Sequence, residues 1–154
     1  MDDDIAQWEP TVPIEITSDV LWRNAAYRLA TYASDFIWPD ISILAADCRT
    51  AKLAEQLFTA VGSIGANYSE AYSRGTDRDR CRLNEYALGS AREARDWCYK
   101  GRHVIGLERT SQFLSLLTRI IQLLTVTTVR ERSRNSRLGA EPAEKRRTRS
   151  IDAR

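Results

Sequence analysis

The stretch Ser63-Ile64-Gly65-Ala66-Asn67-Tyr68-Ser69-Glu70-Ala71-Tyr72-Ser73-Arg74 is the clearest signal of fold class in the chain, because it carries an apolar and a polar stripe at helical spacing. At about 100° per residue, its polar side chains fall within roughly 60° of one another. With one residue further upstream they form what we call the polar row: Gln56, Ser63, Asn67, Glu70 and Arg74. An apolar row runs beside it: Leu53, Leu57, Ala60, Ile64, Tyr68 and Ala71. The pattern predicts a helix that packs one face on a core and meets a polar neighbour with the adjacent face.

The polar row has two interpretations on spacing alone. Uncharged Ser, Asn and Gln side chains on a helix flank are typical of a solvated edge or of a satisfied hydrogen-bond network. Such side chains can also fix the register of helix packing, because a buried polar group needs a partner in a defined position. We hypothesise the structural role, in which the row meets Ser90 and Glu93 of a later helix within one subunit or across a subunit interface.

Four segments show helical periodicity, and none alternates at period two for long enough to predict a strand. The first runs from about Asp19 to Phe36. It is expected to end at Trp38-Pro39, because the residue before a proline is pushed out of the helical region. The second begins near Asp47 or Thr50 and continues to about residue 73.

The third helix is predicted to begin after Gly75, where Thr76 and Asp79 resemble a capping box, and to end at Gly106. The fourth covers about 110–130. Short connections after the second and third helices predict antiparallel neighbours. We therefore expect an all-α fold, an antiparallel four-helix bundle. Within the third helix, the small residues Gly89-Ser90 are expected to let another helix approach closely.

Charge is distributed unevenly along the 154 residues. Residues 1–19 hold six acidic and no basic side chains, whereas residues 130–154 hold nine basic and four acidic ones. We expect residues 20–130 to form the bundle, 1–19 a disordered acidic N-terminal arm in which two prolines block an early helix, and 131–154 a disordered basic tail.

Cysteine usage and hydropathy indicate a soluble, cytoplasmic protein. The three cysteines are widely spaced and odd in number, which argues against a disulfide framework. The chain opens on three aspartates rather than on a basic and apolar leader. The most apolar stretch, 113–129, is short for a membrane span and contains Arg119 and Gln122, so we expect no membrane partner.

The sequence gives little support for a catalytic site or a metal site. His103 is the only histidine, so a Cys/His or Ser/His nucleophile pair has a single candidate base. Its place near a helix C-terminus fits a structural role, because a positive imidazole is favourable there. The cysteines and His103 lack the close spacing of zinc ligands. We expect no enzyme activity, no cofactor and no metal.

Basic side chains favour nucleic acid as a partner. The basic residues predicted to bind phosphates lie on the third helix and in the C-terminal region: Arg78, Arg82, Arg92, Arg95, Arg102, Arg130, Arg132, Arg134, Arg137, Lys145, Arg146 and Arg147. Neutralised phosphates release counterions, which drives binding without sequence readout. Two competing interpretations are a mixed-charge solvated face, in which Arg92 pairs with Asp96, and a tail that contacts the acidic N-terminus.

Three motifs together resemble a known family, the bacterial four-helix bundle proteins linked to intervening sequences in 23S ribosomal RNA. The polar row with Ile64 matches the family pattern Q-x6-S-I-x-x-N-x-x-E-G-x-x-R, except that Ala71 replaces the glycine. Trp22-Arg23-Asn24-Ala25 is similar to its W-x-x-A motif, and Ala87-Leu88-Gly89-Ser90-Ala91-Arg92-Glu93 to its A-x-G-S-x-x-E motif. The resemblance covers roughly residues 20–130. It implies a homopentamer of four-helix bundles that has no catalytic activity and binds nucleic acid.

The expected function is therefore a non-enzymatic homo-oligomer, a pentamer by resemblance, that binds nucleic acid, RNA in preference to DNA, through surface arginines and a basic tail. The alternative is a protein-interaction scaffold, or an accessory subunit of a nucleic-acid enzyme such as a reverse transcriptase. A fold relative, the accessory protein of diversity-generating retroelements, motivates that alternative by analogy.

Overall fold

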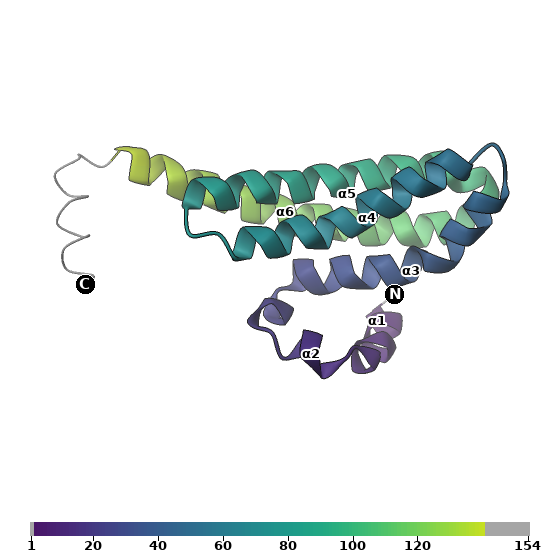
Figure 1. Cartoon of the computed structure of the whole chain (residues 1–154), viewed down its shortest axis with the longest axis horizontal. Helices are drawn as coiled ribbons and strands as arrows, with labels where there is room; N and C mark the ends of the chain where they lie inside the picture. Colours follow the sequence, from purple (N-terminus) through teal and green to yellow (C-terminus); the bar gives the residue numbers. More distant parts are fainter. Residues whose placement is uncertain (1, 141–154) are drawn as a thin grey trace.

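Four long helices dominate the computed structural model, which describes residues 2–140. They are α3 (Ala25–Ala46), α4 (Ala51–Tyr72), α5 (Asp77–Ile105) and α6 (Leu107–Ala140). At most four residues join one helix to the next, so each helix runs back along its predecessor, and Figure 1 shows the four side by side. No strand occurs among residues 2–140, and the predicted all-α class is confirmed.

The hydrophobic core lies along the length of these four helices. All members of the apolar row are buried except Leu53, which is partly buried against the core. They meet the fully buried side chains of the neighbouring helices: Ile37, Leu44, Ala91, Cys98, Phe113, Leu117, Ile120 and Leu124. The helical spacing of apolar residues thus produced one continuous core.

The boundaries of α5 follow the local sequence signals. The Thr76 hydroxyl accepts a hydrogen bond from the Asp79 backbone N–H at 3.1 Å and donates one to the Asp79 carboxylate at 2.7 Å. This contact satisfies a helix donor that would otherwise lack a partner. At the other end Gly106 has a φ of 91°, a backbone conformation that favours glycine. That single residue reverses the chain from α5 into α6.

The predicted end of the first long helix at Trp38-Pro39 is wrong, because α3 continues through Pro39 to Ala46. A proline inside a helix leaves the carbonyl four residues earlier, here that of Asp35, without its helical donor. A side chain from α6 supports this region: Arg109 donates to the Phe36 carbonyl and, at 2.8 Å, to the buried Asp40 carboxylate. Tertiary contacts therefore hold together a helix that local sequence would interrupt.

The expected disorder of residues 1–19 is also wrong. This N-terminal arm forms α1 (Asp2–Trp8), a 3-10 turn (Glu9–Thr11) and α2 (Ile14–Thr17). A second 3-10 turn (Val20–Arg23) then leads into α3. Figure 1 shows the arm folded against one side of α3. The two prolines do not block a helix, because Pro10 lies in a 3-10 turn and Pro13 precedes α2.

Aromatic packing anchors the arm. The Trp8 ring lies 5.1 Å from that of Tyr32 and 5.9 Å from that of Trp22, measured between centroids. The Trp8 indole N–H donates to the Asp35 carboxylate at 2.7 Å, and that of Trp22 donates to Glu9 at 3.2 Å. Charge alone predicted disorder, whereas the contacts of Trp8 with Tyr32 and Trp22 bury the apolar surface that folds the arm onto α3.

The C-terminal boundary differs from expectation as well. Helix α6 starts at Leu107 and extends to Ala140, so residues 131–140 of the predicted disordered tail are helical. The remaining tail lies outside the described residues. The stretch 107–134 is long and apolar enough to cross a membrane by length and composition, with a third of its most apolar window buried. One such helix is weak evidence, because core helices of soluble proteins pass the same test.

The close helix approach expected at Gly89-Ser90 occurs at a different glycine. A Cβ atom on the exposed Gly89 would meet nothing within 4 Å. A Cβ atom on the buried Gly101 would lie 3.0 Å from Leu44 Cδ2 and 3.4 Å from Leu53 Cδ2. Side chains of α3 and α4 therefore pack directly against the backbone of α5 at Gly101.

Candidate nucleic-acid interface

Helix α5 carries five of the predicted phosphate-binding arginines on its solvent side. Arg78, Arg82, Arg92 and Arg95 are exposed, and Arg102 is partly exposed. Because they spread over more than six helical turns, they form a long basic strip rather than one compact site.

The α5 arginines divide by their contacts. Arg82 forms a long ion pair with Asp79 at 3.5 Å, and Arg102 bonds to the Tyr99 carbonyl. Among the described residues Arg78, Arg92 and Arg95 form no hydrogen bond or ion pair. The expected pairing of Arg92 with Asp96 is wrong, because Asp96 instead pairs with Lys100 at 2.5 Å. Three cations on this helix are thus free to contact phosphates.

Aromatic rings alternate with the cations on α5. The Arg82 guanidinium lies 5.9 Å from the Tyr86 ring centroid, and that of Arg102 lies 4.2 Å from the Tyr99 ring centroid. Both tyrosines are about half exposed. Arginine planes and tyrosine rings on one surface can stack on unpaired bases, so this strip offers more than charge.

The C-terminal part of α6 continues the basic surface. Arg130 is exposed and forms no ion pair among the described residues. Arg132 bonds to Glu85 of α5 at 2.7 Å, which raises the pKa of the arginine, and Arg134 lies 4.0 Å from Glu131. Arg137 is within α6, but its side chain is outside the described set. Lys145, Arg146 and Arg147 lie beyond the described residues.

The structure shows hydrogen bonds of the polar row only within α4. The Asn67 amide donates to the Ser63 carbonyl at 2.8 Å, and Glu70 pairs with Arg74. Among the described residues no hydrogen bond joins the row to Ser90 or Glu93, and Glu93 instead accepts from the Trp97 indole at 3.2 Å. Gln56, Glu70 and Arg74 are exposed, whereas Ser63 and Asn67 are half-buried. No hydrogen bond among the described residues therefore supports the predicted contact with α5 inside one subunit, and a contact across subunits stays a prediction.

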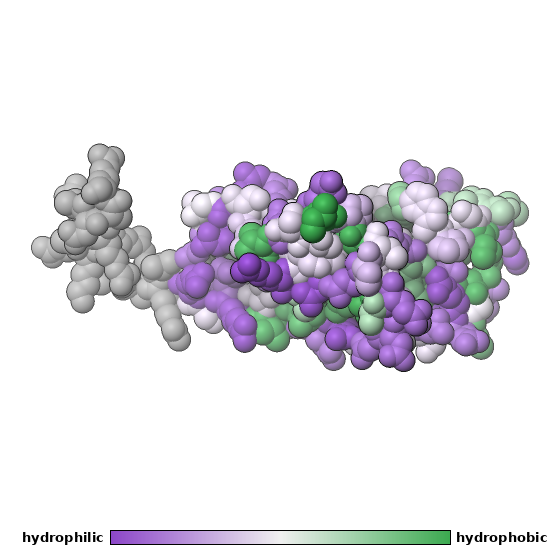
Figure 2. Space-filling model, turned by 90° about the horizontal axis from the view of Figure 1, so that it is seen from below, coloured by the Kyte–Doolittle hydropathy of each residue, from purple (hydrophilic) through white to green (hydrophobic). Residues whose placement is uncertain are grey.

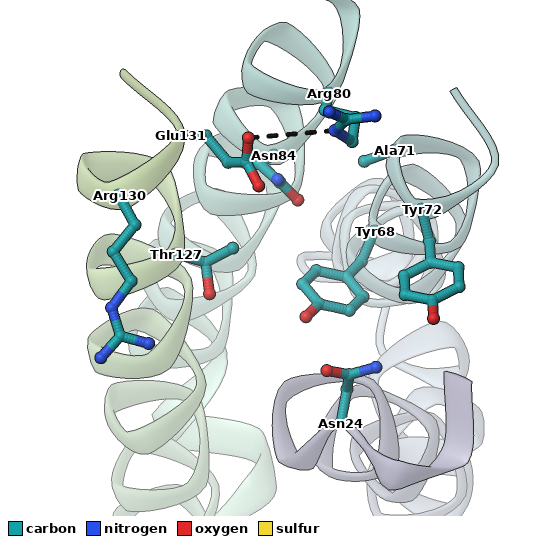
Figure 3. A pocket seen from close by; sticks show the side chains of 9 residues that line it. All are labelled: Asn24, Tyr68, Ala71, Tyr72, Arg80, Asn84, Thr127, Arg130 and Glu131. Atoms are coloured by element: carbon teal, nitrogen blue, oxygen red, sulfur yellow. Dashed lines mark ion pairs between the residues drawn. The ribbon is translucent and has the colours of Figure 1, made fainter. Parts of the chain in front are cut away.

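A cavity opens at the end of the bundle where α4 ends and α5 begins. We call it the end cavity; its volume is about 290 Å³. Figure 3 shows side chains from four segments around it, with the Tyr68 ring and the Asn84 amide directed into the same space. Polar and apolar surface contribute about equally to its wall, which is lined by Asn24, Tyr68, Ala71, Tyr72, Arg80, Asn84, Thr127, Arg130 and Glu131.

Two acceptor atoms of the end cavity form no hydrogen bond with any residue that the structure describes. They are Oδ1 of Asn84, a residue only 5% exposed, and Oε2 of Glu131. Glu131 Oε2 lies 3.9 Å from Arg80 Nε, which is an ion pair but too long for a hydrogen bond. Burial raises the pKa of the Tyr68 hydroxyl, so this group stays protonated at neutral pH. Buried unsatisfied acceptors are uncommon, because each costs free energy unless a donor reaches it.

Sequence reasoning did not connect the residues of the end cavity. Tyr68 belongs to the apolar row, and the sequence pattern assigns no site role to Arg80, Asn84 or Glu131. Their side chains come from four segments far apart in the chain, so no spacing pattern could group them. The one signal available in the sequence was an asparagine, Asn84, among the apolar positions of α5.

Other reactive groups give no catalytic arrangement. Burial raises the pKa of the Cys98 thiol to about 12, and that of Cys81 is raised for the same reason, so both thiols stay protonated. His103 is exposed near the end of α5. Within residues 2–140, no three His, Cys, Asp or Glu side chains gather as metal ligands would.

Comparison with known proteins places these features in context. The family model for the 23S rRNA-intervening sequence protein matches residues 25–126, which contain the polar row and the arginines of α5. No curated protein matches the chain significantly. Among solved structures, the chain is similar to the crystal structure, at 1.70 Å resolution, of a protein of unknown function from the S23 ribosomal protein family of Bacteroides thetaiotaomicron. The two are 21% identical over 68% of this chain and 98% of that chain, with a TM-score of 0.63, which shows a shared fold.

Proposed function

Because this chain belongs to the 23S rRNA-intervening sequence protein family, we propose that it is a non-enzymatic RNA-binding protein that acts as a homo-oligomer, expected to be a pentamer. The observation that carries the proposal is the set of cations without partners on one end of the bundle and along α5: Arg78, Arg92, Arg95 and Arg130. Unpaired arginines keep all their donors available for phosphate oxygens. The arginine and tyrosine pairs on α5 favour RNA with unpaired bases over a DNA duplex.

Binding to RNA should depend steeply on salt and on these cations. We expect the full chain to bind a structured RNA more tightly than a matched DNA duplex in fluorescence anisotropy across a salt series. Replacing Arg92 and Arg95 by glutamine should weaken binding, and it should lower the slope of log affinity against log salt by about 0.7–0.9 for each lost phosphate contact.

The control replaces two arginines outside this strip, Arg23 and Arg119, by glutamine, so that the net charge changes equally. A truncation after Ala140 keeps every described helix and measures what the tail adds. Absence of RNA binding at low salt would contradict the proposal. Equal losses in the two double variants would show that net charge, rather than the α5 strip, drives binding.

The oligomer is proposed to use the polar row. Among the described residues, its side chains form no hydrogen bond or ion pair with another helix. Their bonds lie within α4, from Asn67 to the Ser63 carbonyl and between Glu70 and Arg74. Replacing both Asn67 and Glu70 by alanine should shift native mass spectra of the full chain from pentamer toward monomer. Lys52→Ala/Glu55→Ala, a substitution pair at the start of the same helix, serves as the control. An unchanged pentamer in the Asn67 and Glu70 variant would assign the row to a solvated edge.

The scaffold alternative rests on a separate exposed apolar pair. Trp38 of α3 and Phe58 of α4 are 63% and 42% exposed, and their rings meet edge to face at 5.6 Å. Exposed aromatic pairs are typical of protein contacts. On the face drawn in Figure 2, however, hydrophobic residues form small patches separated by hydrophilic ones. Pull-down of a protein partner that is lost in Trp38→Ser, together with failure to bind RNA, would favour this alternative.

A further inference from the structure

The end cavity adds a specific site to a surface that otherwise offers only charge and stacking. It opens at one end of the bundle, between the last turn of α4, the first turns of α5, the C-terminal part of α6 and the residue before α3. Its volume of about 290 Å³ exceeds many times the ~30 Å³ that one water occupies in the liquid. Figure 3 shows Tyr68, Asn84 and Glu131 turned toward a common space, whereas the Arg130 side chain extends along α6. The cavity is therefore large enough for an organic group.

The ligand must bring hydrogen-bond donors. The unsatisfied atoms, Asn84 Oδ1 and Glu131 Oε2, are both acceptors on adjacent elements. Asn84 is 95% buried, and the Glu131 side chain is only 18% exposed, so bulk water has little access to either. Two acceptors that line the same cavity favour a group with two N–H donors.

Charge and aromatic walls narrow the choice. Arg80 and Arg130 line the cavity together with the carboxylate of Glu131, and Arg80 also pairs with Asp77, so the charges at the wall nearly balance and suit a neutral group. The rings of Tyr68 and Tyr72 supply flat walls, and that of Tyr72 is half exposed at the mouth. A neutral planar ring with donors along one edge fits these features.

Among the RNA bases only guanine has two adjacent donors, N1–H and N2–H, on its Watson–Crick edge, and its O6 can accept from an arginine. We propose that the end cavity binds an unpaired guanine of the RNA, with Glu131 and Asn84 accepting from that edge. The proposal rests on the proposed RNA-binding function and adds to it a base preference at one position.

The test uses the full chain and four hairpin RNAs that differ only in one unpaired loop base: guanine, inosine, adenine or uracil. Inosine lacks the N2 amino group of guanine and is otherwise the same. Loss of one partner of a buried acceptor should lower affinity by about tenfold for inosine, since one base contact of this kind discriminates by roughly 5- to 150-fold. Adenine and uracil should bind no better than inosine.

Two variants connect the preference to the cavity. Glu131→Gln removes a negative charge, so it should raise affinity for all four hairpins while it reduces the guanine preference, because the glutamine amide keeps only one acceptor oxygen. Asn84→Leu fills nearly the same volume without an acceptor and should also reduce the preference. The matched control is Glu85→Gln, which makes the same charge change at the ion pair with Arg132 outside the cavity and should keep the preference. Circular dichroism confirms that each variant is folded.

Each outcome distinguishes the site from the general function. Salt-dependent binding of all four hairpins with equal affinity would overturn the guanine site and leave RNA binding intact. A guanine preference that survives in both Glu131→Gln and Asn84→Leu would place the readout elsewhere and overturn the site. Calorimetric binding of arginine amide but not of GMP, lost in Glu131→Gln, would overturn it in favour of a guanidinium ligand. Failure to bind any RNA at low salt would overturn both proposals.

Discussion

Replacing Arg109 by alanine should lower the free energy of unfolding by about 3–5 kcal/mol, because the substitution leaves a buried carboxylate without its partner. Asp40 is only 4% exposed and accepts a hydrogen bond from Arg109 Nε at 2.8 Å. The same guanidinium donates to the Phe36 carbonyl beside the proline of α3 and lies 3.6 Å from the Phe36 ring centroid. One side chain therefore joins α6 to the part of α3 around Pro39.

Urea unfolding at a fixed protein concentration measures this effect, since assembly changes apparent stability. Arg119→Ala is the control, because its ion pair with Asp2 lies on the surface and should contribute at most about 1 kcal/mol. Adding Asp40→Asn to Arg109→Ala should recover part of the loss by removing the buried charge. A loss in Arg109→Ala no larger than that in Arg119→Ala would contradict the structural role assigned to Arg109.

Replacing Phe113 by alanine should cost a similar amount, about 3–5 kcal/mol, through a cavity in the core. Phe113 is 1% exposed and is among the largest fully buried side chains. Its ring stacks on that of Phe36 with centroids 5.5 Å apart and planes 5° apart, and Phe36 in turn meets Tyr32. The substitution removes the contact that joins α6 to the aromatic residues of α3 and the N-terminal arm.

Thermal and urea unfolding of Phe113→Leu provide the matched comparison, because leucine keeps most of the volume and should cost less than about 1.5 kcal/mol. Gln122→Ala, at an exposed position of the same helix, should change stability by no more than about 0.5 kcal/mol. Because Arg109 and Phe113 both contact Phe36, their combined effect should differ from the sum of the single effects. Equal stabilities of Phe113→Ala and Phe113→Leu would contradict the cavity as the cause of the loss.

The acidic N-terminal arm forms ion pairs with bases of the bundle. Asp2 pairs with Arg119 at 2.5 Å, and Glu9 lies 3.4 Å from Arg28. The acidic arm thus contacts bases of α6 and α3 that were not among the predicted phosphate ligands. The free arginines of α5 and Arg130 remain outside these contacts, which supports the proposed RNA interface.

The sequence by itself determined the all-α class, the apolar faces and the ends of α5, because these depend on local periodicity, capping and the positive φ of one glycine. It also determined the family, through motifs on α4 and α5 and before α3. Charge patterning located the basic strip on α5, since exposed positions of a long helix follow directly from its period.

Only the tertiary structure decided the rest. Helix α3 continues through Pro39, where Arg109 of α6 donates to the Phe36 carbonyl. The acidic arm folds because Trp8 packs against Tyr32. The end cavity unites residues from four segments, among them an asparagine and a glutamate whose acceptors lack donors. Each of these features depends on contacts between residues distant in the chain. Such contacts exist only once the helices have packed, and no local pattern encodes them.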